Sequence, residues 1–437
     1  MKKLPILLIL AGGAGKRFWP FETDKPLFPF AGKPLIWHIA NMATKMRFAS
    51  VIIVTPKDTR SLYESLSLSI PLQIVVQENP LGMADAFLTV SKELQDNPAL
   101  VVIGDDLVEP SIYEKMIQRA EDTSVFGVLV GWKPGKYFPG GYLECIGNRV
   151  IEIREKPGEG NEPSPYVYIA AQYIKDASVF ANVLRTIKDA NDDVYERGLT
   201  VLMKDQHVTM IPYTDSFTTL KYPWHVLDVN TMLLSQLTKK TGRNVVMKKN
   251  VILEGNVYIE DNVTIYENTK IIGPCYIGKG SIIGSNNIIR ASHIGAGCVT
   301  GFNTDITRSY IGDDCWLHSN YIGDSVLESD VSMGSGTVLA NLRLDEEDIT
   351  SVVQNNKIST QKNKCGALIG SHVRIGVNVS VMPGIKIGSD SSIGAGLTIV
   401  EDVPSSSFCV GNRPSYTVKK NTRRVDIESR KQFRMKI

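Results

Sequence analysis

Residues 251–286 read VILEGN VYIEDN VTIYEN TKIIGP CYIGKG SIIGSN, and an aliphatic side chain returns at every sixth position. The repeated residues are Leu253, Ile259, Ile265, Ile271, Ile277 and Ile283, and a second block repeats at Ile369, Ile375, Val381, Ile387, Ile393 and Ile399. An α-helix has no six-residue period, and a disordered tract would not keep isoleucine in register. The period predicts a left-handed parallel β-helix of hexapeptide repeats, with Gly, Asn and Asp at its corners.

This repeat starts near residue 245 and extends to residue 412, with one interruption. The segment 341–366, NLRLDEEDITSVVQNNKISTQKNKCG, is polar and out of register, which predicts a loop or hairpin extruded from the solenoid. Residues 413–437 carry nine Lys and Arg against two acidic residues. We expect a basic C-terminal tail there, either merely solvated or able to reach a phosphate-rich ligand.

Residues 1–240 alternate short apolar runs with helical patterns. The runs PILLILAG, SVIIVT, LQIVVQ, ALVVIGDD and SVFGVLVG predict strands of a covered parallel sheet. The segments PLIWHIANMATKM and MADAFLTVSKEL predict helices between them. This alternation predicts an α/β doubly wound, Rossmann-like domain, which binds ligands at the carboxyl ends of its strands.

The composition narrows the possible partners. The chain has 437 residues, of which 43% are hydrophobic and 22% charged, and its formal charge is +2. A charge so close to neutral argues against a general affinity for nucleic acid or for anionic membranes. The six cysteines form no CxxC pair and the N-terminal apolar run is too short to span a membrane. We therefore expect a cytoplasmic protein with reduced thiols.

A glycine-rich turn at Gly12, Gly13 and Gly15 follows the first apolar run. Such a turn lets backbone N–H groups approach phosphate oxygens, although it matches neither the P-loop nor the GxGxxG pattern. Arg17 and Lys25 come soon after it. Two permanent cations beside a triphosphate would stabilise the charge that develops as pyrophosphate leaves.

The segment 10–36, LAGGAGKRFWPFETDKPLFPFAGKPLI, resembles the N-terminal signature of the sugar-1-phosphate nucleotidylyltransferases, LAGGxGTRLxPLTxxxPKxLxPxxGKP. QENPLGMADAF, VVIGDD, PGGYLECIGNRVIEIREKP and YPWHVLDVN resemble later motifs of that family, so the likeness covers most of residues 5–240. The resemblance implies attack of a sugar-1-phosphate oxygen on the α-phosphate of a nucleoside triphosphate. By position it implies Arg17 and Lys25 as catalytic residues, Gly12, Gly13, Gly15, Gln77 and Gly82 for the nucleotide, Gly140 and Glu155 for the sugar, and Asp105 for Mg²⁺.

Four positions depart from that pattern, namely Lys16, Met83, Ile169 and Thr219. Thr219 stands where the family usually has a second carboxylate for the metal. Asp215, Asp228 and Asn230 are nearby side chains that could replace it, and the sequence does not choose among them. These departures leave two alternatives open, a fully active nucleotidyl-transfer site and a weakened one.

The segment 317–345, LHSNYIGDSVLESDVSMGSGTVLANLRLD, resembles a motif of glucosamine-1-phosphate acetyltransferase domains, and flanking segments extend this likeness over nearly the whole solenoid. The resemblance implies that His318 is the general base that deprotonates the sugar amine as it attacks acetyl-CoA. It implies Arg290, Tyr321 and Asn341 for the acetyl acceptor, and Ser335 and Ala395 for acetyl-CoA. Thr307 stands where a phosphate-binding Lys is usual, and Arg308 compensates only if its coil turns it inward.

The leading hypothesis is a bifunctional enzyme of nucleotide-sugar synthesis, which makes a product such as UDP-N-acetylglucosamine. Its substrates would be an NTP, with UTP expected, a sugar-1-phosphate and acetyl-CoA, and its cofactor Mg²⁺. One alternative is a nucleotidylyltransferase whose solenoid serves only assembly. Another is a regulatory or scaffold protein that binds nucleotide sugar at a degenerate N-terminal site. The resemblance also implies a homotrimer, or a dimer of trimers.

Overall fold

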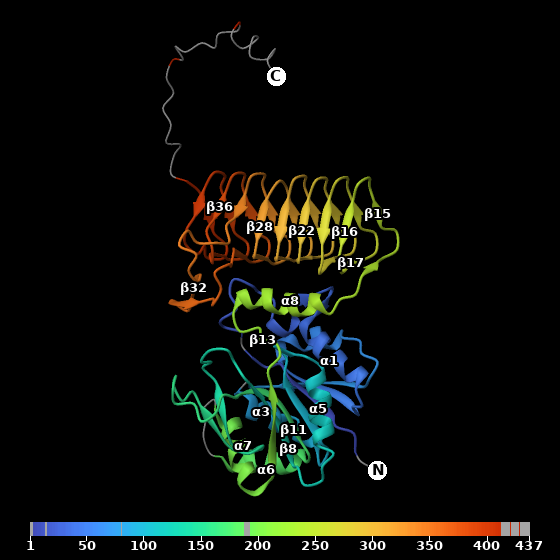
Figure 1. The fold of residues 1–437 in the computed structure, drawn as a ribbon, viewed down its shortest axis with the longest axis vertical. Coiled ribbons are helices and arrows are strands. Elements are labelled where there is room, and N and C mark those ends of the chain that lie inside the picture. Colours follow the sequence, from blue (N-terminus) through green and yellow to red (C-terminus); the bar gives the residue numbers. More distant parts are fainter. Residues whose placement is uncertain are drawn as a thin grey trace.

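The computed structural model describes residues 3–13, 15–79, 81–187 and 193–411, together with residues 420 and 428. They form an α/β domain followed by a solenoid of short strands, with helix α8 (Val226–Ser235) lying directly against the solenoid (Figure 1). Apart from residues 420 and 428, the expected basic tail lies outside the described residues. No helix within the described ranges is long and apolar enough to cross a membrane.

The N-terminal domain is built on a nine-stranded sheet with the order β5-β4-β1-β6-β11-β8-β12-β10-β9. These strands are β1 (Ile6–Leu10), β4 (Ser50–Pro56), β5 (Leu72–Gln77), β6 (Ala99–Ile103), β8 (Gly127–Trp132), β9 (Gly141–Ile146), β10 (Arg149–Glu155), β11 (Val167–Ile174) and β12 (Val208–Tyr213). Every strand predicted from the apolar runs is present. The sheet is mixed, however, because β11 runs antiparallel to both β6 and β8.

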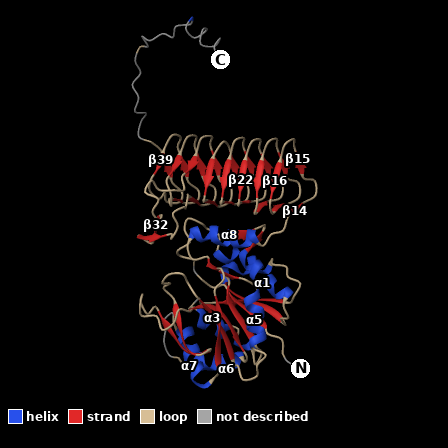
Figure 2. Ribbon diagram, viewed as in Figure 1, coloured by secondary structure: helices blue, strands red, loops and turns tan. Residues whose placement is uncertain are grey.

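Helices cover both faces of this sheet (Figure 2). Alternate residues of β1 explain why: Leu7 and Ile9 pack on one side, and Ile6, Leu8 and Leu10 on the other. The first side is covered by α1 (Leu35–Lys45), α2 (Arg60–Glu64), α5 (Ser111–Arg119) and α8, and the second by α3 (Met83–Thr89), α4 (Ser91–Leu94), α6 (Ala177–Thr186) and α7 (Val194–Asp205). The helix predicted over residues 83–94 is thus two short helices joined at Val90.

Shorter elements complete the domain. They are η1 (Lys25–Leu27), η2 (Lys57–Thr59), η3 (Pro223–His225), the pair β2 (Pro29–Phe30) and β3 (Lys33–Pro34), and the pair β7 (Asp106–Val108) and β13 (Phe217–Thr219).

The solenoid consists of three parallel sheets, which confirms the β-helix of hexapeptide repeats. The first sheet contains β14 (Lys240–Thr241), β17 (Val257–Ile259), β20 (Cys275–Ile277), β23 (His293–Ile294), β26 (Tyr310–Ile311), β29 (Val326–Leu327), β34 (Leu368–Ile369) and β37 (Lys386–Ile387). The second contains β15 (Val246–Met247), β18 (Thr264–Ile265), β21 (Ile282–Ile283), β24 (Val299–Thr300), β27 (Trp316–Leu317), β30 (Ser332–Met333), β35 (Arg374–Ile375), β38 (Ser392–Ile393) and β40 (Phe408–Cys409). The third contains β16 (Ile252–Glu254), β19 (Lys270–Ile272), β22 (Ile288–Arg290), β25 (Asp305–Thr307), β28 (Tyr321–Gly323), β31 (Val338–Leu339), β36 (Ser380–Val381) and β39 (Thr398–Ile399).

The repeated aliphatic residues fill the interior of the solenoid. All are buried except Leu253, which is partly buried at the first coil. The corners are occupied as predicted, since Asn262, Asn268 and Asn286 have left-handed backbones, a conformation that asparagine tolerates better than most residues. The polar insertion forms the hairpin β32 (Thr350–Val353) and β33 (Asn356–Ser359), which projects from the solenoid (Figure 1).

Between the two regular blocks the repeat takes five-residue steps, for example from Ile289 to Ile294 and from Ile306 to Ile311. A buried serine closes the corner in each of these steps, and Ser309 N donates to Ser292 Oγ at 3.0 Å. The residue before Ser309, Arg308, takes a left-handed backbone. These shortened corners matter because they hold Arg290, which is expected to bind the acetyl acceptor, and Arg308.

Candidate functional site

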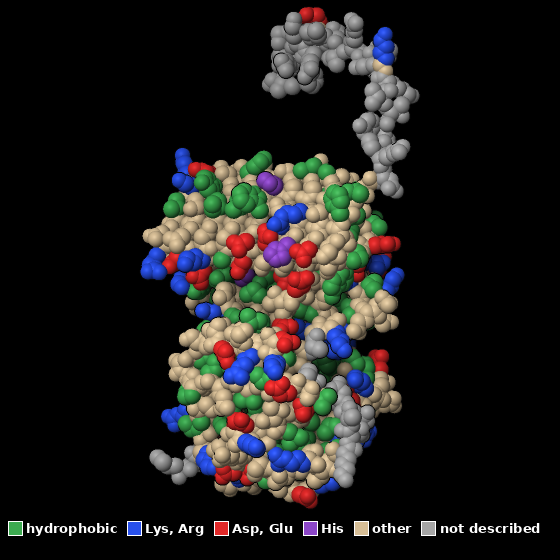
Figure 3. Space-filling view, turned by 180° about the vertical axis from the view of Figure 1, so that it is seen from behind, with side chains coloured by type: hydrophobic (Ala, Val, Ile, Leu, Met, Phe, Trp, Pro, Cys, Tyr) green, Lys and Arg blue, Asp and Glu red, His purple; other side chains and the backbone are tan. Residues whose placement is uncertain are grey.

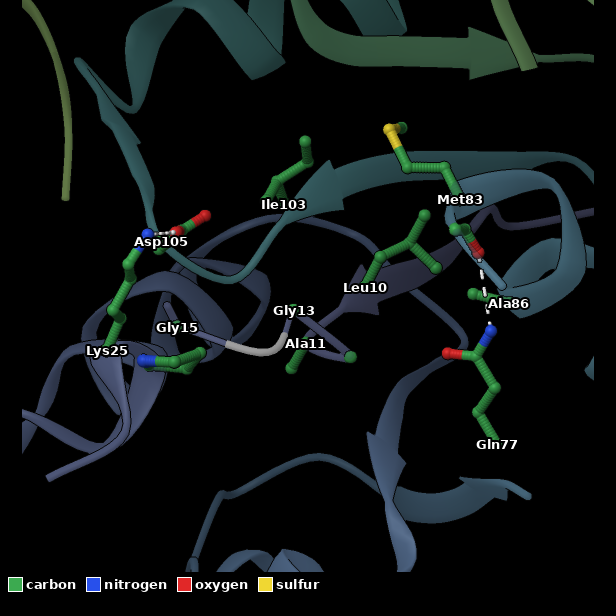
Figure 4. A pocket seen from close by; sticks show the side chains of 13 residues that line it. Leu10, Ala11, Gly13, Gly15, Lys25, Gln77, Met83, Ala86, Ile103 and Asp105 are labelled. Atoms are coloured by element: carbon green, nitrogen blue, oxygen red, sulfur yellow. Dashed lines mark hydrogen bonds and ion pairs between the residues drawn. The ribbon is translucent and has the colours of Figure 1, made fainter. Parts of the chain in front are cut away.

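A cavity of about 360 Å³ opens where β1 and β6 end (Figure 4). The predicted nucleotide residues that line it are Gly12, Gly13, Gly15, Gln77 and Gly82, together with Lys25 and Asp105. The carboxyl ends of parallel strands meet at one edge of a sheet, which explains how residues from three separate motifs converge. The structure therefore brings this predicted set together.

The glycine loop combines an unusual backbone with a close approach. Gly15 has a φ of +60°, a conformation that disfavours side chains. At Gly12 a Cβ atom would lie 2.5 Å from Gln77 Oε1. Glycine at this position thus leaves room for the Gln77 amide beside the loop.

The Gln77 side chain is buried and held in one orientation. Its Nε2 donates to Asp85 Oδ2 at 2.6 Å and to the Gly82 carbonyl at 3.3 Å. Both partners can only accept hydrogen bonds, so the amide nitrogen must face them. The amide oxygen consequently points toward the glycine loop, as Figure 4 shows.

Lys25 and Asp105 form an ion pair at the other end of this cavity, with 3.2 Å between Nζ and Oδ2 (Figure 4). Lys25 starts the short helix η1, and Asp105 follows β6. Both side chains are largely shielded from solvent, with exposed fractions of 12% and 22%. A shielded pair interacts more strongly than a surface pair, and it fixes the ammonium group of Lys25 beside the glycine loop.

A second cavity, of about 320 Å³, adjoins the first and shares Lys25, Met83, Ile103 and Asp105 with it. It is also lined by Arg17, Gly140 and Glu155, the remaining catalytic and sugar-binding residues predicted for this domain. Ile169 and Thr219 line it as well. Of the four departures from the family pattern, only Lys16 lines neither cavity.

Thr219 lies opposite Asp106 where β13 pairs with β7. Burial, with a further contribution from the charge of Asp105, raises the pKa of Asp106 to about 7, and the Thr219 hydroxyl opposes this rise. Lys221 lines the same cavity, and burial lowers its pKa. The position expected to hold a second carboxylate thus has a neutral hydroxyl, with an additional lysine nearby.

The three side chains considered as replacements for that carboxylate lie elsewhere. Asp228 is paired with Lys362 of the solenoid insertion, and it lines a neighbouring cavity together with Asp215. Asn230 is buried within α8. None of the three lines the cavities that contain Asp105. Asp106, directly after Asp105, is a further carboxylate that lines the second of these cavities, together with Glu155 and Glu196.

The residues predicted to bind the acetyl acceptor gather on the third sheet of the solenoid. Arg290 Nη2 lies 2.8 Å and 2.9 Å from the two carboxylate oxygens of Asp305, which neighbours Tyr321 across the strands. Tyr321 Oη donates to Asn341 Oδ1 at 3.4 Å. Arg290, Tyr321 and Asn341 are therefore parts of one cluster.

Asp324 organises the remainder of this cluster. Its carboxylate accepts hydrogen bonds from Arg308 Nε and Nη2, each at 2.7 Å, and from Asn341 Nδ2 at 2.5 Å. Arg308 is turned toward Asn341 in this way, whereas the neighbouring Thr307 side chain is buried. Two guanidinium groups, each oriented by a carboxylate, thus lie at this surface.

His318 lies at the corner between the second and third sheets, exposed to solvent and three residues before Tyr321. The other predicted residues of the acetyl-CoA site follow along the same corner. Gly336 N donates to the Ser319 carbonyl at 2.9 Å, Asn378 N to Ser335 O at 3.0 Å, and Gly396 N to Val377 O at 2.9 Å. Ser335 therefore lies in the coil next to that of His318, and Ala395 lies two coils further along the same corner.

Comparison with known proteins agrees with this two-part organisation. Residues 6–211 match the family model of nucleotidyl transferases, and residues 256–291 and 366–400 match that of bacterial transferase hexapeptides. The chain is 30% identical to a bifunctional sugar-1-phosphate nucleotidylyltransferase/acetyltransferase of Sulfurisphaera tokodaii, over 92% of this chain and 98% of that protein. The chain belongs to this bifunctional family. It is also 29% identical to the bifunctional protein GlmU of Methanococcus vannielii, over 92% of this chain and 96% of that protein.

Three side chains in or beside these cavities were not assigned from the sequence, namely Asp85, Asp106 and Lys221. Asp106 directly follows Asp105 in VVIGDD, and Lys221 precedes the YPW motif, so both were visible but unassigned. Asp85 lies in the QENPLGMADAF motif, eight residues after Gln77. Its role depends on the turn that starts α3, and residue spacing alone does not reveal it.

Substitution Gly12→Ala tests the geometry of the nucleotide cavity in this bifunctional family member. The added methyl group would displace the Gln77 amide. We expect the affinity for a non-hydrolysable UTP analogue, measured by isothermal titration calorimetry, to fall roughly tenfold or more, since overpacking costs about 1–3 kcal/mol. Gly135→Ala is the matched control, because nothing lies within 4 Å of its Cβ position and Gly135 does not line the nucleotide cavity. An equal loss of affinity in both variants would contradict this geometry.

Proposed function

We propose that this chain N-acetylates a hexosamine-1-phosphate with acetyl-CoA on its β-helix and transfers a nucleotidyl group to a sugar-1-phosphate in its α/β domain. The observation that carries the proposal is the presence of two separate clusters on one chain. One is the glycine loop with the Lys25–Asp105 pair, and the other is the His318 corner with Tyr321 and Asn341.

Nucleotidyl transfer needs positioned substrates and compensation of charge more than it needs covalent catalysis. The backbone amides of the glycine loop would hold the triphosphate, and Gly140 and Glu155 would hydrogen-bond the sugar in the adjoining cavity. A sugar-phosphate oxygen then attacks the α-phosphorus, and the bond to pyrophosphate breaks. Arg17 and Lys25 would stabilise the negative charge of the departing pyrophosphate.

Asp105 and Asp106 fit the requirements of a magnesium site at this position. No group of three or more His, Cys, Asp or Glu side chains within the described residues could hold a metal ion alone. Mg²⁺ commonly binds through one or two carboxylates plus substrate phosphates and water, which is the donor set available here. Bound there, Mg²⁺ would neutralise phosphate charge. Lys221 adds positive charge beside Thr219, where the second carboxylate is missing.

The orientation of Gln77 favours a particular class of base. Its amide oxygen is presented toward the cavity, and this oxygen can accept a hydrogen bond from the N3–H of uracil or thymine. Cytosine has an acceptor at N3, so it would leave both groups unpaired. UTP is therefore our expected nucleotide, with CTP disfavoured.

Substitution Asp85→Asn tests this source of selectivity. An asparagine amide can either donate or accept, which permits Gln77 to turn its own nitrogen toward the base. We expect the ratio of kcat/KM for UTP over CTP to fall roughly tenfold, the value of one misplaced hydrogen bond of about 1.4 kcal/mol. The control is Glu78→Gln, which changes an exposed carboxylate next to Gln77. An unchanged ratio in Asp85→Asn would rule out this orienting role.

Acetyl transfer would take place at the His318 corner. The amine nitrogen attacks the thioester carbonyl carbon, a C–N bond forms, and the C–S bond breaks to release coenzyme A. His318 accepts the amine proton, and Tyr321 and Asn341 position the amino sugar. Arg290 and Arg308 present guanidinium groups to the sugar phosphate, each oriented by its aspartate.

This corner is open in a single chain, which supports a trimeric assembly as part of the proposal. Hydrophobic side chains lie on the outer surface of the solenoid (Figure 3). They include Ile282, Phe302 and Trp316 near the proposed site. Association of three solenoids would cover such residues and enclose acetyl-CoA between neighbouring subunits.

Substrates of this kind and unpaired cysteines suit a cytoplasmic location.

A second candidate function is nucleotide-sugar binding without turnover in the N-terminal domain. Thr219 favours it, because the hydroxyl supplies no negative charge for the metal. The pair formed by Lys25 and Asp105 opposes it. A one-activity nucleotidylyltransferase, with the solenoid serving only assembly, is opposed by the cluster around Asp324.

The direct test supplies Mg²⁺, UTP and N-acetylglucosamine-1-phosphate in one reaction, and acetyl-CoA with glucosamine-1-phosphate in another. We expect pyrophosphate in the first and free thiol in the second, with galactosamine-1-phosphate and other NTPs as comparisons. Thiol release without pyrophosphate would indicate an acetyltransferase alone. If neither pyrophosphate nor free thiol is released, the result would support a protein that binds nucleotide sugar without turnover.

Two variants separate the proposed activities. Arg17→Ala should lower pyrophosphate release by roughly 10²–10³-fold through loss of transition-state charge stabilisation. His318→Ala should lower thiol release by about 10²–10⁴-fold through loss of the general base. Each variant serves as the control for the other, since the second activity should persist. Loss of both activities in either variant would contradict two independent sites.

A further inference from the structure

The segment from Arg17 to Phe30 faces two parts of the molecule at once. On one side Arg17 and Lys25 line the nucleotide and sugar cavities. On the other side the segment lies against the solenoid, through contacts between residues more than 280 positions apart. The only regular elements within it are the short helix η1 and strand β2.

Glu328, directly after strand β29 of the solenoid, makes the central contact. Its side chain is buried, and Oε1 accepts hydrogen bonds from Thr23 N at 3.0 Å and Thr23 Oγ1 at 2.7 Å. Oε2 accepts from Glu22 N at 3.3 Å and from Ser371 N at 3.1 Å. Three of the four donors thus belong to the segment, and one belongs to the solenoid. Hydrogen bonds to a carboxylate are stronger than neutral ones, and burial keeps water from replacing them.

Both ends of the segment are also attached to the solenoid. Near the start, Trp19 Nε1 donates to Ser405 Oγ at 3.3 Å, and Lys386 Nζ lies 5.2 Å from the centre of the Trp19 ring. Lys386 is itself buried and paired with Asp402 at 2.6 Å. Near the end, Tyr310 Oη donates to the Pro29 carbonyl at 2.7 Å. These contacts fix the flanks, and between them Glu328 holds the backbone of Glu22 and Thr23.

We propose, on the basis of the proposed nucleotidyl transfer, that Glu328 is a positioning residue for that reaction. It holds the backbone at Thr23 and thereby places Lys25, two residues later, against the phosphates. The β-helix in this account is a structural part of the nucleotidyl-transfer site as well as the support of the acetyl-transfer site.

Substitution Glu328→Gln in the full chain keeps the side-chain volume but replaces one acceptor oxygen with an NH₂ group. That group would face either the Thr23 donors or the amides of Glu22 and Ser371, which are also donors. We expect kcat for pyrophosphate release to fall roughly tenfold, the effect of losing about 1.5 kcal/mol of charged hydrogen bonding. Thiol release in the acetylation assay should stay unchanged. Asp330→Asn is the matched control, since this carboxylate near Glu328 pairs with His372 and Arg374.

A double-mutant cycle with Lys25→Ala distinguishes positioning from general stability. If Glu328 acts through Lys25, Glu328→Gln should have almost no further effect on kcat once Lys25 is removed. Additive losses, or an equal loss of both activities in Glu328→Gln, would overturn the proposal.

Limited trypsin digestion provides a readout that does not depend on turnover. Cleavage after Arg17 should be several-fold faster in Glu328→Gln than in the unmodified chain or Asp330→Asn, because a loosened segment opens more often. If the unmodified chain released no pyrophosphate, nucleotidyl transfer itself would fail as the proposed function. The digestion would still decide whether Glu328 holds the segment, and unchanged cleavage would overturn that claim.

Discussion

A segment with little secondary structure supplies two of the proposed catalytic side chains, and its position depends on contacts with the other domain. Residues 17–30 connect the glycine loop to the region before helix α1, and they contact the solenoid on the way. Burial of Phe28 and Phe30 against Tyr310 provides much of the attraction, with ring centres 5.2 Å and 5.7 Å from Tyr310. Such apolar contacts are weakly directional. The hydrogen bonds of Glu328 and Tyr310 therefore define the register of the backbone.

The charges of the N-terminal site follow from this arrangement. Arg17 and Lys25 belong to the segment 17–30, which contacts the solenoid, whereas Asp105 and Asp106 follow strand β6 of the sheet. Thr219 and Lys221 join them through the pairing of β13 with β7. Replacing a carboxylate by threonine makes the site more positive, a change that favours phosphate binding while reducing the ligands available to a metal. The balance between these two effects determines whether this site turns over or only binds.

Much of the fold could be predicted from the sequence because its pattern is local. One aliphatic residue per hexapeptide fills the solenoid interior, so the period reports the β-helix directly. The glycine loop and the apolar runs likewise predicted a binding site at the end of β1, where the structure has a cavity. The antiparallel strand β11 was not predicted, since an apolar run gives no strand direction. The five-residue steps near Arg290 and Arg308 break the period, and the serines that close them became clear only in the structure.

The parts of the candidate site that could not be predicted depend on distant pairs. Thr23 and Glu328 are separated by 305 positions, and no spacing rule links them. Asp106 was passed over because Asp105 matched the family motif. The role of Asp85 depends on the orientation of the Gln77 amide, which is a property of tertiary structure. In each case the residue type was visible, but its partner was not.

Hydrogen–deuterium exchange of the unmodified full chain, followed by mass spectrometry, tests most directly whether the solenoid holds the segment 17–30 of the N-terminal domain in place. Amides that are bonded to a buried group exchange only when that region opens. The account predicts that peptides covering residues 19–25 exchange as slowly as the solenoid coil that contains Glu328. Exchange as fast as that of the projecting hairpin at residues 350–359 would contradict it.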